Sequence, residues 1–290
     1  MEKTFDTPGG ADLVVHNQVG RVLVTARETD TATVSLQAHS PGAEELVEGA
    51  TVESKQAGGR HVVAVKIPHQ HGRRILHRDA VTVRVEVPEG GHVRVATASA
   101  DIEINGPVGD VDVKTASGDA SVDEVAADVK AMTASGNITV GTAGGDIKAQ
   151  TASGDLRCSS VAGSTEFSTV SGDLEVGAAG SRVQAKATSG SVRLGELTHG
   201  AKVANVSGNV RVLTLSEGPL DVRSVSGDVA VGVAKGVDLH VDVETASGTV
   251  HSDIDLFDAP ARGRRPETRV DLRVRSVSGN VEIGRALEHV

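Results

Sequence analysis

The chain has 290 residues and a formal net charge of −10, which disfavours general attraction to nucleic acid or to anionic lipid. It has 34 glycines, no tryptophan, no tyrosine and three phenylalanines, so an aromatic-rich core is excluded, as are stacking platforms for single-stranded nucleic acid. Small aliphatic residues must fill the core, which fits a thin interior between closely spaced sheets.

The N-terminus, Met1 to Pro8, has no basic stretch followed by an apolar run, so no secretory signal is expected. No segment approaches the ~18 consecutive apolar residues of a membrane span. We therefore expect a cytoplasmic protein, which would reach the cell surface only by non-classical export. The one cysteine, Cys158, lies at an inward repeat position, which predicts a small buried hydrophobe rather than a reactive thiol.

Residues 1–95 are irregular but rich in β-branched apolar runs, which predict strands. Residues 42–47 form the only credible helical turn. We expect irregular β-rich opening rungs or a cap, because an uncovered sheet edge invites pairing with another chain.

Histidine and arginine cluster between residues 69 and 78. A His-x-His pair such as His69 and His71 would place both rings on one face of a strand, as a zinc site needs. Pro68 and Gly72 flank the pair and favour an exposed loop. A zinc site, an anion- or partner-binding loop and a plain solvated loop all stay open, with the plain loop favoured.

The region 96–290 is predicted to be a regular β-solenoid, because a Ser-Gly-Asp-like turn recurs every 18 residues from 117 to 208 and then at looser spacing. Each turn should need a glycine that tolerates positive φ. The structural turn glycines are Gly118, Gly136, Gly154, Gly172, Gly190, Gly208, Gly227, Gly248 and Gly279.

Strict alternation of apolar and polar residues flanks each turn, as in 111–115 and 272–276, and this indicates half-buried strands. The predicted fold is all-β: a single-stranded parallel β-solenoid, or β-helix, with 18-residue rungs and irregular N-terminal rungs. The left-handed hexapeptide helix of acyltransferases fits poorly, because steps of six from Val111 reach Ser117 and Asp123.

The residue after each turn glycine forms a polar column. Its members are Asp119, Asn137, Asp155, Asp173, Ser191, Asn209, Asp228, Thr249 and Asn280. Oxygen ligands could hold calcium, but Asp and Asn also favour turns by bonding backbone amides, which is the preferred interpretation. The adjoining Ser and Thr columns have no His or Lys base at a matching phase. We therefore predict no catalytic residue, no metal site and no cofactor.

A loop insertion is predicted near 253–269, between the last two turn glycines. Its basic residues Arg262, Arg264, Arg265 and Arg269 form a candidate partner-binding loop, because loops that interrupt a regular scaffold often carry its function. The tail after Ile283 looks too short to cover the last rung, so end-to-end self-association is a second possibility.

The Thr-Ala-Ser-Gly-Asp and Ser-Val-Ser-Gly-Asp turns resemble those of the bacterial β-strand-repeat family labelled putative adhesin, a domain of unknown function. The strand-Gly-strand at 14–24, the step at 85–90 and the closing segment 276–283 also fit, so the resemblance covers nearly the whole chain. It implies a parallel β-solenoid without established catalysis.

The predicted function is a non-catalytic scaffold or interaction module, adhesin-like, that binds an unknown protein partner or itself. The alternatives are a self-assembling cytoplasmic polymer of the bactofilin type and, less favoured, a polysaccharide-active β-helix enzyme. The enzyme would need clustered carboxylates and aromatic sugar platforms, and the chain has neither tyrosine nor tryptophan.

Overall fold

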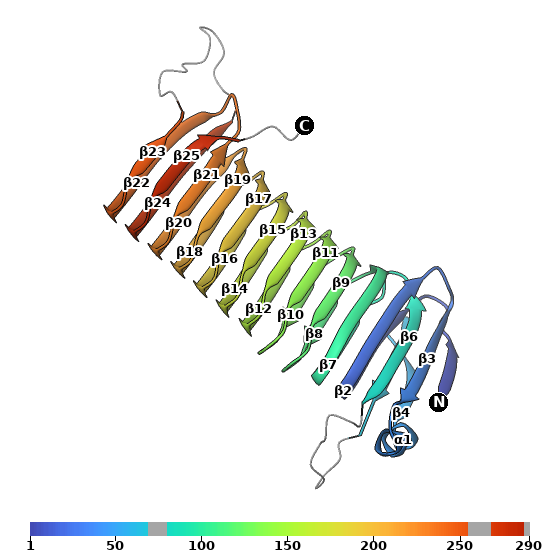
Figure 1. Ribbon diagram of the computed structural model, residues 1–290. Coiled ribbons are helices and arrows are strands. Elements are labelled where there is room, and N and C mark those ends of the chain that lie inside the picture. Colours follow the sequence, from blue (N-terminus) through green and yellow to red (C-terminus); the bar gives the residue numbers. More distant parts are fainter. Residues whose placement is uncertain (69–79, 255–267, 287–290) are drawn as a thin grey trace. The chain divides into compact units, whose positions relative to one another are not determined.

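A computed structural model describes residues 1–68, 80–254 and 268–286. The chain divides into two compact units, residues 1–145 and 146–290, and each is described by itself. Within each unit parallel strands stack rung upon rung, so the predicted all-β parallel solenoid is confirmed (Figure 1). The predicted boundary between residues 95 and 96 stays a prediction.

The first unit contains β1 (Glu2–Asp6), β2 (Ala11–Arg27), β3 (Thr31–Ala38), α1 (Pro41–Glu48), β4 (Thr51–Ala57), β5 (Arg60–Lys66), β6 (Val81–Pro88), β7 (Val93–Val108), β8 (Val111–Lys114), β9 (Ala120–Val125), β10 (Val129–Met132) and β11 (Ile138–Ala143).

Each regular rung of the first unit has two strands, one in each of two facing sheets. The strand β8 pairs in parallel with β10, and β9 pairs in parallel with β11, at a register of 18 residues. The long strands β7 and β2 each run through both sheets and lie side by side in parallel. The 18-residue period therefore sets which residues share a column.

Antiparallel strands close the first unit at its N-terminal end. The strands β5 and β6 extend the two sheets beyond β2 in parallel, and then β4, β3 and β1 pair in antiparallel fashion. The helix α1 contacts β3 and β6. It begins at the cap residue Ser40, whose hydroxyl accepts from the Ala43 amide, and Pro41 follows as a residue suited to the first turn. The helix expected at 42–47 is confirmed, whereas the antiparallel pairing was not predicted.

The second unit contains β12 (Ile147–Ser153), β13 (Leu156–Val161), β14 (Thr165–Ser171), β15 (Leu174–Ala179), β16 (Val183–Ser189), β17 (Val192–Leu197), β18 (Ala201–Ser207), β19 (Val210–Leu215), β20 (Gly218–Ser226), β21 (Val229–Val233), β22 (Asp238–Ser247), β23 (Val250–Ser252), β24 (Arg269–Ser278) and β25 (Val281–Arg285).

A narrow aliphatic core fills the space between the two sheets of the second unit. Among the residues described there, the one buried aromatic is Phe167, which is 1% exposed and lies between Ala149 and Ala185 of the adjoining strands, so a large ring is accommodated by two small neighbours. Cys158 occupies an inward column and is buried, as predicted. Burial raises the pKa of its thiol to about 11.

The last rungs of the second unit do not stack in chain order. Strand β24 pairs with β20 on one side and with β22 on the other, while β25 lies in the same way between β21 and β23. The final rung in the sequence is thus the penultimate rung in space, and β22 with β23 forms the outermost one (Figure 1). The sequence was interpreted as a loop inserted into a rung, and this exchange of order was not foreseen.

The helix α1 is the only helix in the parts of the chain that the structure describes. With eight residues it is too short to cross a membrane.

Candidate functional site

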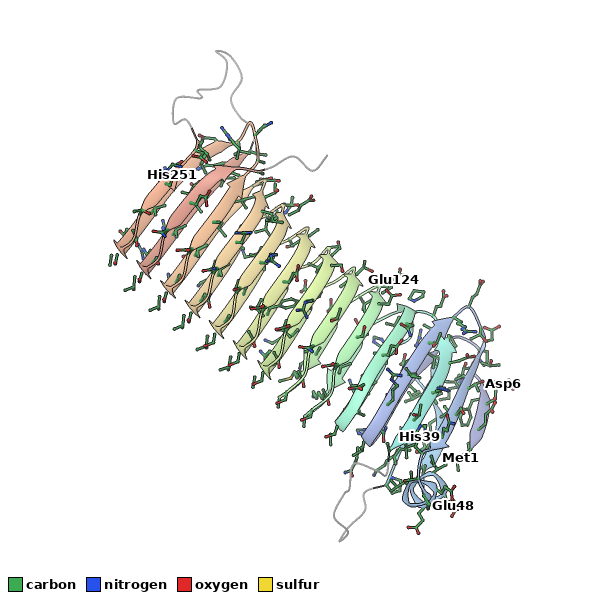
Figure 2. The ribbon with its side chains drawn as sticks, in the orientation of Figure 1. Met1, Asp6, His39, Glu48, Glu124 and His251 are labelled. Atoms are coloured by element: carbon green, nitrogen blue, oxygen red, sulfur yellow. The ribbon has the colours of Figure 1, made fainter. Side chains whose placement is uncertain are left out.

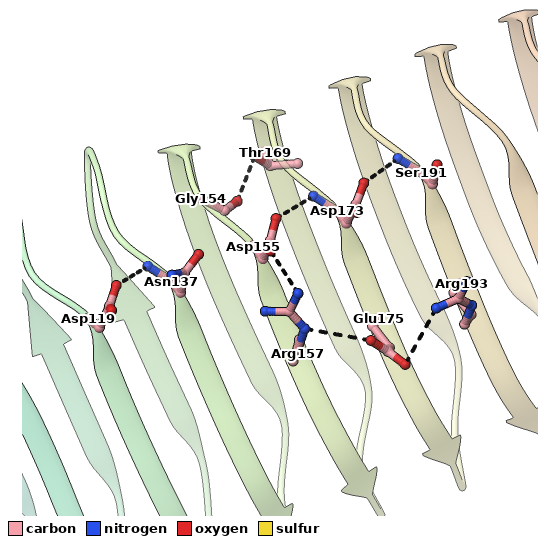
Figure 3. A network of polar contacts seen from close by, with 10 residues as sticks. All are labelled: Asp119, Asn137, Gly154, Asp155, Arg157, Thr169, Asp173, Glu175, Ser191 and Arg193. Atoms are coloured by element: carbon pink, nitrogen blue, oxygen red, sulfur yellow. Dashed lines mark hydrogen bonds and ion pairs between the residues drawn. The ribbon is translucent and has the colours of Figure 1, made fainter.

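The polar column after the turn glycines forms a hydrogen-bonded ladder between rungs. In the second unit, Oδ1 of Asp155 accepts from the Asp173 amide at 2.9 Å, and Oδ1 of Asp173 accepts from the Ser191 amide at 2.8 Å (Figure 3). In the first unit, Oδ1 of Asp119 accepts from the Asn137 amide at 2.8 Å. Each side chain thus satisfies a backbone donor one rung away, rather than one in its own turn.

A second ladder of the same kind occupies the other corner of the rungs and was not predicted from the sequence. Oδ1 of Asp110 accepts from the Asp128 amide at 3.0 Å in the first unit, and Oδ1 of Asp146 accepts from the Ser164 amide at 2.8 Å in the second. The signal was present, because Asp110, Asp128 and Asp146 also recur at intervals of 18. The bond from the Ser164 amide holds the pKa of Asp146 below its ordinary value.

These ladders leave the Asp columns with a structural role. Among the described residues no group of three or more His, Cys, Asp or Glu is arranged to hold a metal ion. The bond from the Asp173 amide lowers the pKa of Asp155. Hydrogen bonding of this kind stabilises an exposed carboxylate without a cation. His69, His71 and His77 lie outside the described residues, so the zinc alternative stays a prediction.

The turn glycines are required mainly because adjacent rungs approach closely. A Cβ on Gly172 would collide with the carbonyl oxygen of Gly154, and one on Gly190 with that of Gly172. Eight of the nine glycines have positive φ, between 123° and 156°. The ninth, Gly136, does not, so the expected reason fails there. A Cβ on Gly136 would nevertheless meet the carbonyl oxygen of Gly118.

The hydroxyl column beside the turns is buried and is only partly hydrogen-bonded. Oγ1 of Thr169 donates to the Gly154 carbonyl at 3.4 Å (Figure 3). Asn205 occupies the same column and donates to the carbonyls of Gly190 and Gly208. The hydroxyls of Thr115 and Thr133 have no partner within the described part of the chain. The hydroxyls of this column therefore do not form a continuous ladder of hydrogen bonds within the described residues.

Ion pairs connect neighbouring rungs on the outer surface of the second unit. Glu175 lies between Arg157, at 3.6 Å, and Arg193, at 4.0 Å (Figure 3). On the other sheet, Lys148 lies 2.9 Å from Glu166 and donates to its carboxylate, which lowers the pKa of Glu166. A single carboxylate can thus pair with cations on both sides. Exposed pairs of this kind contribute little to stability.

A column of exposed valines runs across β14, β18, β20 and β24. Val170, Val206, Val225 and Val277 are 47–55% exposed and share one position of the repeat, with Thr188 of β16 between the first two. We call these five residues the valine face. Single exposed valines are common, but Val206, Val225 and Val277 stack on adjoining strands and form an apolar stripe, which Thr188 separates from Val170. Exposed apolar patches of this kind mark interaction surfaces.

Cations border the valine face. An open groove of about 490 Å³ is lined by Val170, Thr188, Val206 and Val225 together with Lys186 and Arg223. Among the described residues that line the groove, Lys186 and Arg223 carry charge and none is acidic, so the groove combines apolar and cationic surface.

The predicted partner-binding arginines are only partly described. Arg269 begins β24, and its guanidinium donates to Oδ1 of Asp271 at 2.7 and 2.9 Å. It lines a cavity of about 420 Å³ that also includes His240, Asp242 and Arg273. Arg262, Arg264 and Arg265 lie outside the described residues, so their role stays a prediction.

Comparisons with known proteins give one family and several solved structures. The model of the family Toastrack DUF4097 matches residues 12–195 and 126–284. No curated protein matches. Two solved structures are a putative adhesin from Parabacteroides distasonis ATCC 8503, 13% identical with a TM-score of 0.47, and one from Parabacteroides merdae ATCC 43184, 13% identical with a TM-score of 0.46. The alignments cover 97% of this chain, and 97% and 95% of those chains.

A third solved structure is a putative lipid binding protein from Parabacteroides distasonis ATCC 8503, with 12% identity and a TM-score of 0.32. That alignment covers 97% of this chain and 96% of the other.

Proposed function

The chain belongs to the Toastrack DUF4097 family, and we propose that it is a non-catalytic, adhesin-like interaction module that binds a partner protein through its valine face. The observation that carries this proposal is the column of four half-exposed valines bordered by Lys186 and Arg223. An apolar stripe with flanking cations favours a partner surface that is apolar at its centre and acidic at its rim.

The test is quantitative binding of the labelled full chain to intact bacterial cells and to immobilised cell-surface proteins. The face variant carries Val170→Ser, Val206→Ser and Val225→Ser, and it should bind about tenfold more weakly, a loss of ~1.4 kcal/mol. The matched control carries Arg157→Ser and Arg193→Ser on the other sheet and should bind like the wild type. Equal binding by the face variant, or no saturable binding by the wild type at micromolar concentration, would refute the proposal.

The arginine-rich segment is a second candidate contact within the same function. A variant with Arg262→Ser, Arg264→Ser and Arg265→Ser, measured in the same assay, separates its contribution from that of the valine face. Cell-surface adhesion also requires an export route, and detection of the chain on intact cells would establish one.

The alternative of a self-assembling polymer finds less support. A filament needs two ends that can pair, and the first unit ends in antiparallel strands with charged edges. Lys3 and Glu53 lie there, and Lys3 donates to the Val52 carbonyl. Growth into rods with rising concentration in analytical ultracentrifugation would favour the polymer. Cleavage of any member of a panel of acidic polysaccharides would favour the enzyme.

A further inference from the structure

The outermost rung of the second unit has a strand edge that no described strand covers. Strand β22 pairs with β24 on one side, and no described strand pairs with its other side. Its inward residues Leu239, Val241 and Val243 are partly exposed, whereas the equivalent residues of β24 are at most 1% exposed. In the other sheet, Val250 of β23 is 50% exposed, and its neighbour Val281 is 1% exposed. Apolar surface and backbone groups are therefore both available along this edge.

The backbone donors that remain free can be assigned from the register. The Asp238 amide donates to the Thr268 carbonyl, so its N–H and C=O point toward β24. Because these groups alternate along a strand, the N–H groups of Leu239, Val241 and Val243 point away from β24. The same three residues direct their side chains toward the core. An added strand would thus find hydrogen-bonding groups and an apolar column together.

The charges on this edge define the partner. The outward residues of β22 include Asp238, Asp242 and Glu244. Asp242 lies 3.2 Å from Arg273 and Glu244 lies 3.4 Å from Arg275, both on β24. The side chains of Asp242 and Glu244 remain 43% and 69% exposed, so each carboxylate can accept a second cation from beyond the edge. Glu175, which pairs with arginines on both neighbouring rungs, demonstrates that one carboxylate can serve two.

A second copy of the chain does not fit this edge well. Suppose that the β22 edges of two copies pair in antiparallel fashion, with the inward residues of both strands on the same face. Every register centred near the middle of the strand then places two carboxylates opposite each other, such as Asp238 against Glu244. Like charges directly opposite destabilise a strand pair. His251 on β23, which Figure 2 labels, does not offset this acidity, because its Nε2 already lies 2.7 Å from Oδ1 of Asp253.

We propose that the free edge of β22 binds an extended segment of a partner protein in which basic residues alternate with apolar ones. The strand β24, Arg-Val-Asp-Leu-Arg-Val-Arg, is the template, because it already makes this contact on the other side of β22. The partner strand adds to the sheet, its apolar residues cover Leu239, Val241 and Val243, and its basic residues reach Asp242 and Glu244. No residue of the valine face lies on β22, although Val277 lies on the neighbouring strand β24. Variants at one site therefore leave the residues of the other unchanged, and either site can fail without the other.

The experiment measures binding of a fluorescent peptide with the sequence of residues 269–278 to the full chain by anisotropy. The control peptide replaces its three arginines with glutamate. Val241→Pro removes a free edge donor but breaks no bond to β24, and proline is tolerated at such edge positions. Val241→Thr keeps the N–H and the shape. Circular dichroism and thermal melting establish that both variants are folded.

We expect the arginine-containing peptide to bind the wild type and Val241→Thr saturably, and to bind Val241→Pro about tenfold more weakly. The glutamate peptide should bind none of them. If Val241→Pro lowers stability, Glu244→Lys tests the same edge through charge and should weaken binding by a similar factor. Equal binding to Val241→Pro and Glu244→Lys, equal binding of the glutamate peptide, or no binding at all would overturn the proposal. So would a concentration-dependent dimer of the wild type that Val241→Pro abolishes, because a second copy would then occupy the edge.

Discussion

Replacing Asp173 tests whether the Asp column supplies hydrogen-bond acceptors or negative charge. Oδ1 of Asp173 accepts from the Ser191 amide at 2.8 Å, and the Asp173 amide donates to Asp155. Asparagine keeps the acceptor and removes the charge, and Asn209 already bonds the Asp228 amide in this way. Alanine removes both.

The magnitudes follow from two opposing effects. A net hydrogen bond contributes about 1 kcal/mol, and here water can partly replace it because Asp173 is exposed. Carboxylates on adjacent rungs, ~4.8 Å apart, repel each other by roughly 0.9 kcal/mol in water before salt screens them. At high salt, where the repulsion is screened, Asp173→Ala should lower the free energy of unfolding by about 0.5 kcal/mol, because only the lost hydrogen bond remains. At low salt the relief of the repulsion should offset this loss. Asp173→Asn should be neutral or stabilising, most clearly at low salt.

The assay is chemical and thermal unfolding of each single variant and of the double variants that also change Asp228, which bonds the Asn280 amide at 2.8 Å. The two sites are three rungs apart, which is ~14 Å at ~4.8 Å per rung, so their effects should add. If the 145-residue second unit unfolds cooperatively, 1 kcal/mol corresponds to a shift in Tm of about 3 °C. Asparagine as destabilising as alanine would refute the acceptor role. A Tm raised by calcium in the wild type and not in the asparagine variants would restore the calcium interpretation.

Three other predictions concern the corners and the core. Gly172→Ala should lower the Tm strongly, because the added Cβ meets backbone. Gly284→Ala should be neutral by the same melting assay, because no atom of the described residues lies within 4 Å of the added Cβ. The pKa of Asp155 is lowered in the folded state, so its stabilisation is fully present above the unfolded value of ~3.9 and is lost as pH falls through the folded pKa. Acid unfolding of Asp155→Asn should accordingly be less steep below pH ~4 than that of the wild type. Cys158, whose thiol pKa is raised to about 11, should react with a thiol reagent at pH 8 only after denaturant is added, and rapid reaction of the folded chain would contradict its burial.

The features that recur every 18 residues were predictable from the sequence. The period identified the turns, and the alternation around them assigned the inward columns, including that of Cys158. The period can be found by comparing the repeats with one another, and the alternation follows because a strand with one buried face must alternate. The reason given for the glycines was incomplete, since the close approach of the Gly172 corner to the Gly154 carbonyl depends on the neighbouring rung.

The valine face was not predicted, although its residues are visible in the repeat. Val170, Val206 and Val225 stand where Ala116, Ala134 and Ala152 stand in other repeats. The available signal was valine in place of alanine at an outward position, but this position directly precedes the Ser-Gly turn and was interpreted as part of it. The N-terminal antiparallel strands could not be predicted from alternation, because a half-buried strand alternates identically in parallel and antiparallel pairs.

The order of the last rungs follows from what each would bury. The inward positions of β25 are Val281 and Ile283, whereas those of β23 are Val250 and Ser252. Enclosing Ile283 rather than leaving it at the end gains about 1.5–3 kcal/mol, and a buried Ser252 hydroxyl without a partner would cost about 1–3 kcal/mol. In the observed order Ile283 is 1% exposed, and the exposed Ser252 accepts from the Ile254 amide. Charge does not decide the order of these rungs. Whether β22 lies outside β24 or between β20 and β24, Arg273 has Asp242 as a neighbour and Arg275 has Glu244. The rung with the less apolar inward residues in this sheet therefore takes the end, and this is also the rung whose outer edge no described strand covers.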